Sequence, residues 1–180
     1  EVRAKIPTGG GSWPAIWMYP TDRWRYSGGC DAKVGDPKPG KCVSWPNSGE
    51  IDIMEHVGNG LGTVHGTVHN KAYYWVNGKQ RKGAVIIDNI GEGFYTYAMN
   101  WTPDRIDIFV DDTLYFTYIR EEDADWRAWP FDHPFHVILN LAIGGSWGRA
   151  AGGIDDRKFP QRLEIDYVRA YEFTGKRGRK

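Results

Sequence analysis

Residues 48–58 read SGEIDIMEHVG and carry three carboxylates, Glu50, Asp52 and Glu55, among apolar side chains. Side chains alternate between the two faces of a strand, so Glu50 and Asp52 share one face while Glu55 points to the other. A one-residue bulge near Met54 would bring Glu55 onto the carboxylate face, and bulges are common beside active sites. The out-of-phase spacing therefore predicts a bulged strand with one carboxylate face and one buried face.

Three carboxylates on one face raise the pKa of at least one of them by repulsion between like charges. Retaining glycosidases use such a set, because an ionised carboxylate attacks the anomeric carbon while a protonated partner donates to the leaving oxygen. Asp52, between Glu50 and Glu55, is placed to bias which carboxyl carries the proton. The alternative is a solvated acidic edge strand, and the interleaved apolar residues argue against it.

The rest of the chain favours an all-β fold. Period-two alternation recurs in short runs separated by turn residues, as in a sandwich of two antiparallel sheets. The strongest runs are residues 63–69, 95–101, 105–110, 114–118, 135–143 and 163–171, with a hairpin turn at 111–112. In 135–143, alternation puts Asn140 on the polar face. The best helix candidate, residues 120–129, has too few apolar positions for more than a turn or two.

Composition restricts the kind of ligand. The chain has 180 residues, enough for one domain, with 23 acidic and 23 basic residues, so no net field favours nucleic acid or an anionic membrane. Nine Trp, ten Tyr and seven Phe indicate an aromatic-lined groove beside the ordinary core. No apolar run is long enough for a membrane helix. We expect a neutral partner.

Cys30 and Cys42 bracket a segment rich in Gly, Pro and Lys that has no apolar face to hold it in place. A disulfide between them would hold it and would imply an oxidising, extracellular compartment. Two free thiols in a loop are the alternative. We expect the disulfide and a secreted protein.

Several motifs together resemble glycoside hydrolase family 16, most closely its laminarinase branch. The active-site strand of that family carries the signature Glu-x-Asp-x-x-Glu, found here in WPNSGEIDIMEHVG. The other matching motifs follow in family order: KIPTGGGSWPAIWM (5–18), GTVH after the catalytic strand, NWTPDRIDIFVDD (100–112), FHVILNLAIGGSWG (135–148) and LEIDYVRAYEF (163–173).

The resemblance implies a β-jelly-roll with a concave cleft and a retaining endo-1,3-β-glucanase. Glu50 would be the nucleophile, Asp52 its assisting carboxylate and Glu55 the general acid/base. The long signature is less typical of mixed-linkage glucanases, while agarase and carrageenase specificities stay open. A carrageenase would show basic residues near the cleft for sulfate, and the motifs here are aromatic and acidic.

Other expected site residues follow from the same motifs. Trp13, Trp17 and Trp147 match sugar platforms, Trp101 and Trp45 would form secondary walls, and Asn140 and Arg25 would bind hydroxyls. His69 would hydrogen-bond near the carboxylates; a metal pair with His65 is the alternative, but no further ligand has zinc spacing.

The resemblance implies no cofactor for catalysis and allows one structural calcium at Asp166. We expect a catalytic domain over 1–173 that lacks the family's first strands, a disordered basic tail over 174–180, a monomer and a neutral β-glucan substrate. A non-catalytic glucan-binding module and a transglycosylase are the alternatives. The carboxylates favour an enzyme over the binding module, and only water access separates a transglycosylase from a hydrolase.

Overall fold

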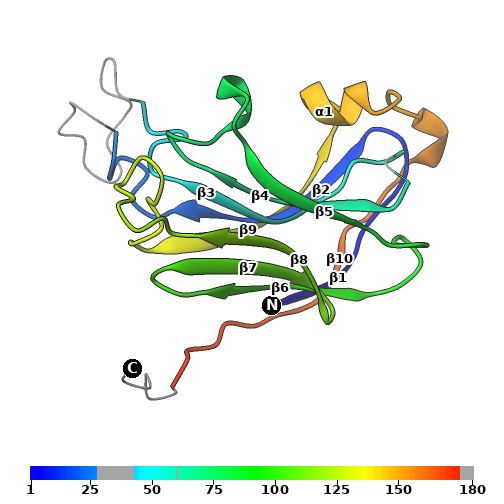
Figure 1. The fold of residues 1–180 in the computed structure, drawn as a ribbon. Coiled ribbons are helices and arrows are strands. Elements are labelled where there is room, and N and C mark those ends of the chain that lie inside the picture. The colour runs from blue at the N-terminus through cyan, green and yellow to red at the C-terminus, as the bar shows by residue number, and fades with distance from the viewer. Residues whose placement is uncertain (28–42, 60, 175–180) are drawn as a thin grey trace.

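The structure is a computed structural model that describes residues 1–27, 43–59 and 61–174. Within these ranges ten strands form two five-stranded sheets, and every pair of neighbours is antiparallel (Figure 1). The back sheet has the order β10–β1–β6–β7–β8, with bounds Glu164–Val168, Val2–Lys5, Tyr95–Trp101, Arg105–Val110 and Thr113–Ile119. The cleft sheet has the order β5–β4–β3–β2–β9, with bounds Arg81–Ile86, Thr63–His69, Glu50–Glu55, Ser12–Pro20 and Phe135–Ile143. The all-β jelly-roll prediction is confirmed.

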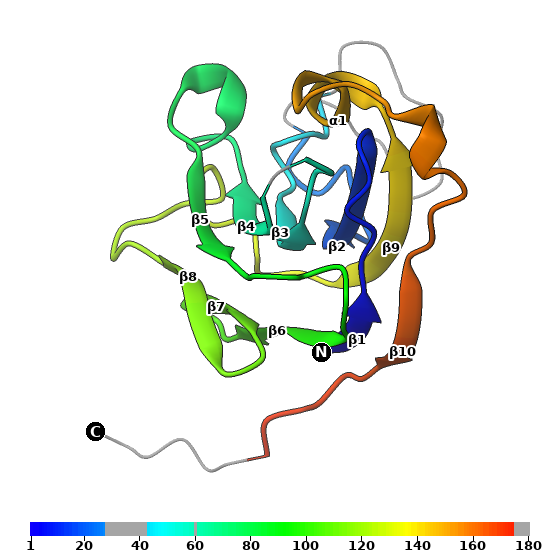
Figure 2. The same ribbon diagram turned by 90° about the vertical axis from the view of Figure 1, so that its right-hand side faces the viewer.

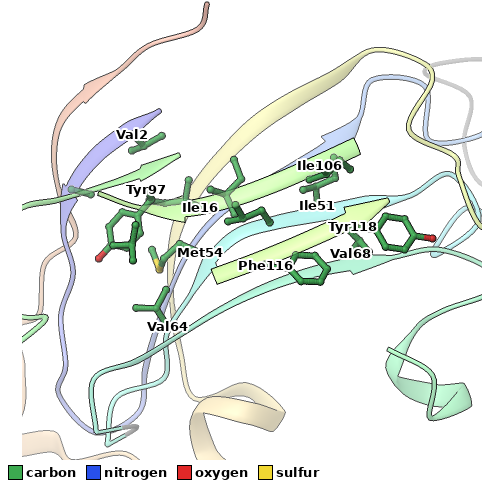
Figure 3. Packing of buried hydrophobic residues seen from close by; sticks show 14 of the residues in the cluster. Val2, Ile16, Ile51, Met54, Val64, Val68, Tyr97, Ile106, Phe116 and Tyr118 are labelled. Carbon is green, nitrogen blue, oxygen red and sulfur yellow. The ribbon is translucent and has the colours of Figure 1, made fainter. Parts of the chain in front are cut away.

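The core fills the space between the two sheets. Ile106 and Ile108 of β7 are fully buried, and so is Val64 of β4, because alternate residues of each strand face the opposite sheet. Figure 3 shows Met54 of the cleft sheet and Phe116 of the back sheet among these apolar side chains. Each buried aliphatic or aromatic side chain contributes about 1.5–3 kcal/mol relative to exposure. The core therefore supports β3, the strand that carries the carboxylates, on the face opposite to them.

The predicted strands agree closely with the structure. β4, β6, β7 and β9 have the predicted bounds, β8 includes the predicted run, and β10 is shorter than predicted. Asp111 has a φ of 46° between β7 and β8, as expected for a tight hairpin turn.

Several elements were not among the predicted runs, and β5 and α1 show why. β5 (Arg81–Ile86) is an edge strand with mostly exposed side chains and a glycine, so it lacks a clear apolar face. The helix α1 (Gly145–Ala150) has only six residues and no apolar stripe. The helix candidate at 120–129 forms turns, and the short 3-10 helices are η1 (Trp75–Asn77) and η2 (Asp156–Lys158).

Two loops rise on the outer face of the cleft sheet. In Figure 2 the loop with η1 rises beside β5, and α1 rises on the opposite side, near β2 and β9. No helix in the described ranges has the length and apolarity to span a membrane. Cys30 and Cys42 lie outside the described residues, and so does the predicted tail beyond residue 174. The disulfide and the disordered tail therefore stay predictions.

Candidate active site

The predicted bulge is present in β3. Against β2, Trp17 pairs with Asp52 and Ile16 pairs with Met54, which leaves Ile53 as the extra residue. The register against β4 shifts between Asp52 and Glu55 as well. The bulge sends both Ile53 and Met54 into the core, where they are 6% and 0% exposed. Glu55 consequently points to the same face as Glu50 and Asp52.

The carboxylates form part of the wall of two cavities on the outer face of the cleft sheet. The smaller has a volume of about 240 Å³ and is lined by Trp13, Ala15, Trp17, Glu50, Asp52, Glu55, Asn140 and Ala142. The larger has a volume of about 540 Å³, and its lining includes Glu50 and Glu55 again. Its walls come from both raised loops, through Trp75 of η1 and Ser146, Trp147 and Ala150 of α1. A polymer could thus reach both glutamates from one continuous face.

Each of the two glutamates accepts a hydrogen bond from a tryptophan. Nε1 of Trp45 donates to Oε2 of Glu50 over 3.2 Å, and Nε1 of Trp13 donates to Oε1 of Glu55 over 3.0 Å. An N–H donor stabilises the ionised carboxylate and lowers its pKa. The two indoles therefore partly offset the effect of burial on Glu50 and Glu55.

His69 of β4 faces the first two carboxylates. Its Nε2 lies 3.1 Å from Oδ2 of Asp52 and 3.7 Å from Oε1 of Glu50. Burial lowers the pKa of His69, against the opposing effect of the carboxylates, so the imidazole favours its neutral form. The Trp45 ring lies 5.6 Å from the His69 ring, centroid to centroid. His69 is therefore held at the position predicted for it, next to the carboxylates.

Burial raises the pKa of all three carboxyl groups. The pKa of Glu50 rises to about 8, first through burial and then through the negative charge of Asp52. The pKa of Asp52 rises well above its usual value through burial and the charge of Glu55. Burial also raises the pKa of Glu55. The cluster thus carries fewer than three negative charges near neutrality, so it holds at least one proton that can be donated.

The structure brings most of the predicted binding residues to the cavities. Trp17 donates through Nε1 to Oδ1 of Asn140 over 2.7 Å, and both line the smaller cavity. Trp147 packs edge-on against Trp13 with ring centroids 5.5 Å apart. These rings and the amide offer apolar surface and hydrogen bonds side by side, which suits a sugar.

Trp101 does not belong to the site, and its predicted role as a cleft wall is wrong. It lies on β6 in the back sheet and packs against the core, with its ring centroid 5.4 Å from that of Phe135. Arg25 is exposed, with its guanidinium carbon 6.0 Å from the Tyr26 ring centroid, and lines neither cavity. The structure does not bring Arg25 to the carboxylates.

The predicted calcium ligand has another partner. Asp166 of β10 accepts a hydrogen bond from Arg3 at 2.5 Å and forms an ion pair with it. A guanidinium this close opposes a second cation, so the contacts of Asp166 do not fit a calcium site. Among the described residues, one group of three possible metal ligands has its ligand atoms within 4.8 Å of one another, namely Glu50, Asp52 and His69. Those three residues are the ones for which the sequence predicts a catalytic role.

Several cavity residues were not predicted. His65 lines the larger cavity beside Trp147, with ring centroids 5.0 Å apart, although the sequence suggested it only as an alternative metal ligand. Its shared face with His69 was the signal that could have identified it. Trp75, Gln80 and Lys82 also line the larger cavity. They come from η1, from β5 and from the segment between the two elements, where the sequence has no strong periodicity.

Comparison with known proteins agrees with this geometry. The family model for glycosyl hydrolases family 16 matches residues 37–169. The β-glucanase of Rhodothermus marinus is 47% identical over 178 residues, which cover 97% of this chain and 57% of that protein. The keratan-sulfate endo-1,4-beta-galactosidase of Sphingobacterium multivorum is 38% identical over 172 residues, covering 96% of this chain and 36% of the relative.

Among solved structures, the laminarinase from Rhodothermus marinus superimposes with a TM-score of 0.77 at 44% identity. The match covers 92% of this chain and 61% of that chain. The sequence thus spans about 57% of the length of the R. marinus β-glucanase and a smaller part of the galactosidase. With the catalytic signature, the bulged strand and the sheet order in place, the chain belongs to glycosyl hydrolases family 16.

Proposed function

We propose that this chain carries out retaining endo-hydrolysis of 1,3-β-glucans of the laminarin type. The observation that carries the proposal is the bulged strand β3, which presents Glu50, Asp52 and Glu55 to one cavity wall lined by tryptophans. The similarity to a laminarinase at 44% identity supports the substrate class. The cavities lie on the open face of a sheet between two loops, and this supports attack within a polymer.

In the proposed reaction, a carboxylate oxygen of Glu50 attacks the anomeric carbon while Glu55 gives its proton to the departing glycosidic oxygen. A glycosyl ester on Glu50 results. Glu55, now ionised, takes a proton from water, which attacks the same carbon and releases Glu50. Two inversions retain the configuration. These steps use side chains alone, and no cofactor enters them.

Asp52 and His69 would control the charge of the nucleophile. The buried His69 nitrogen beside Asp52 and Glu50 holds these carboxyls in place, and the charge of Asp52 raises the pKa of Glu50. Substrate covers the site and removes water, which strengthens each of these interactions. The cluster is therefore suited to a proton that moves among its members during the two steps.

The cavity lining supports a neutral substrate. Among the described residues, Lys82 is the only lysine or arginine that lines either cavity. A sulfated polymer usually requires several such cations, preferably arginines. The relationship to a keratan-sulfate galactosidase nevertheless makes a galactan the natural competitor in a substrate panel.

The test is incubation of the purified chain with laminarin, curdlan, lichenan, agarose and keratan sulfate, followed by NMR of the products. We expect internal cleavage of laminarin with the β-anomer appearing first. Initial release of the α-anomer would overturn the retaining mechanism. Cleavage of agarose or keratan sulfate without cleavage of laminarin would overturn the substrate, and products longer than the substrate would indicate transglycosylation.

We also propose that the protein is secreted and monomeric, with a Cys30–Cys42 disulfide. A polymeric glucan lies outside the cell, and the cysteines bracket a segment that a disulfide would hold. Alkylation of the unfolded protein without reductant should label neither cysteine, as mass spectrometry would show. Labelling of both would exclude the disulfide, and size-exclusion chromatography with light scattering would measure the oligomeric state.

A further inference from the structure

The register of β8 against β7 shifts at one residue. Ile108 pairs with Phe116 and Phe109 pairs with Leu114, so Tyr115 is an extra residue on β8. On a regular strand Tyr115 would point away from the core, opposite to Phe116. The irregularity turns it inward instead, and it packs against the core beside Phe116. Such a change of direction is what a bulge does to a side chain.

The hydroxyl of Tyr115 crosses the core and donates to the backbone carbonyl of Ile53. Ile53 is itself the extra residue of the catalytic bulge in β3. One hydrogen bond therefore joins the irregular position of the back sheet to the irregular position of the cleft sheet. The bonded carbonyl lies two residues before Glu55, in the segment that turns Glu55 toward the cavities.

Two paired glycines make this approach possible. Gly66 of β4 lies opposite the bulge, between the partners of Asp52 and Glu55, and Gly83 of β5 pairs with Gly66. A Cβ on Gly66 would lie 2.8 Å from Cε2 of Tyr115, and a Cβ on Gly83 would lie 2.1 Å from the Tyr115 carbonyl oxygen. Any side chain at either position would force β8 or the Tyr115 ring away from the catalytic strand.

From these contacts we infer that Tyr115 is a positioning residue, which holds the β3 bulge in the register that directs Glu55 into the active site. The inference rests on the proposed glycosidase function. Tyr115 touches no substrate and acts through the backbone of β3. Burial raises the pKa of the Tyr115 hydroxyl, so the group stays a hydrogen-bond donor.

The experiment compares Tyr115→Phe with a matched control, Tyr118→Phe, in the 180-residue chain. Tyr118 lies on the same strand, and its hydroxyl donates to the backbone carbonyl of Ala128 at 2.6 Å, away from the cavities. Both variants lose one buried hydroxyl that bonds a carbonyl. The Tyr118 hydroxyl also accepts a hydrogen bond from Nδ2 of Asn70 at 3.2 Å, so the control loses at least as many hydrogen bonds as Tyr115→Phe. Only Tyr115→Phe releases the catalytic bulge.

We expect kcat on laminarin to fall about 10- to 100-fold in Tyr115→Phe, the scale of a catalytic group displaced by about 1 Å. KM should stay within about threefold, because the binding tryptophans do not move. Tyr118→Phe should keep kcat within about twofold of the wild type. A Tyr115→Phe kcat within twofold of an active wild type, or an equal loss in Tyr118→Phe, would overturn the inference.

A second measurement does not depend on activity. Amide hydrogen exchange at Met54 and Glu55 should be faster in Tyr115→Phe than in both the wild type and Tyr118→Phe. Equal exchange in the three proteins would show that Tyr115 does not hold the bulge. If the wild type cleaves no glucan, the proposed function fails, and the exchange experiment still decides whether Tyr115 holds this segment.

Discussion

The indole of Trp13 donates a hydrogen bond to Oε1 of Glu55 over 3.0 Å, so one side chain both lines the cavity and acts on the proposed acid. A donor to the ionised carboxylate lowers its pKa. Trp13→Phe keeps an aromatic ring but removes the donor, so the pKa of Glu55 should rise. The acid then stays protonated to higher pH, and the basic limb of the pH profile of kcat/KM should move to higher pH.

Trp17→Phe is the control for this prediction. It also removes an indole N–H from the smaller cavity, but the donated bond goes to Asn140. The basic limb of its pH profile of kcat/KM should lie at the same pH as in the wild type. A Trp13→Phe profile that overlays the wild type would argue against Glu55 as the group that this indole tunes.

The raised pKa of Glu50 predicts a cost in stability. The group titrates near 4.5 when unperturbed and near 8 in the folded protein. Between these values the unfolded chain loses the proton first, so the wild type loses stability as the pH rises through this window. Glu50→Gln stays neutral and should be more stable than the wild type, with a gain near zero at pH 4 that grows toward pH 8.

Urea unfolding at several pH values measures this gain. Its slope should be at most about 1.4 kcal/mol per pH unit for one proton. Glu92→Gln, a change at an exposed carboxylate, is the control. A constant difference between Glu50→Gln and the wild type would mean that the pKa of Glu50 is not raised.

Removal of the proposed nucleophile should be rescued by azide. Glu50→Ala should lower kcat by at least about 10⁴-fold, a loss typical of a missing nucleophile. Azide fits the space left by the side chain and attacks from the same face, which gives an α-glycosyl azide from a β-glucan. NMR of the product reads its configuration. A β-glycosyl azide would instead show that Glu55 is the nucleophile and Glu50 the acid/base.

Replacement by alanine should affect substrate binding at Trp147 and stability at Trp101. Trp147 lies in the larger cavity, so Trp147→Ala should raise KM for laminarin oligosaccharides about 10-fold, the loss of one aromatic contact of about 1.4 kcal/mol. Trp101→Ala should lower the melting temperature and leave KM nearly unchanged, because its ring packs on the core. A large KM effect at Trp101 would contradict its placement in the back sheet.

The bulge was predictable because the charged and apolar positions of residues 50–55 are out of phase, and only an extra residue reconciles them. Trp101 shows the limit of the same reasoning. Alternation in residues 95–101 indicates which side chains share a face, but it does not indicate which sheet the strand joins. That choice depends on long-range pairing, and here β6 pairs with β1 and β7.

Tyr115 was hidden for a related reason. Simple alternation over residues 114–118 sets it on the face opposite Phe116, and only the shifted register with β7 turns it inward. Lys82 of β5, which lines the larger cavity, was also unpredictable, because this edge strand has no buried face to give a periodic signal. His65 could have been predicted from the sequence, since it lies on the same face of its strand as His69.

The bulge at Ile53 also bears on how such a strand can change over generations. Deleting the codon for Ile53 would leave Glu-x-Asp-x-Glu, a spacing in which a regular strand keeps all three carboxylates on one face. The strand can therefore lose one residue without sending its acid into the core. The deletion would remove the carbonyl that accepts the hydrogen bond from Tyr115, so the Tyr115 hydroxyl would lose its partner. In a lineage that shortened this strand, selection would favour replacement of Tyr115, which lies in the opposite sheet.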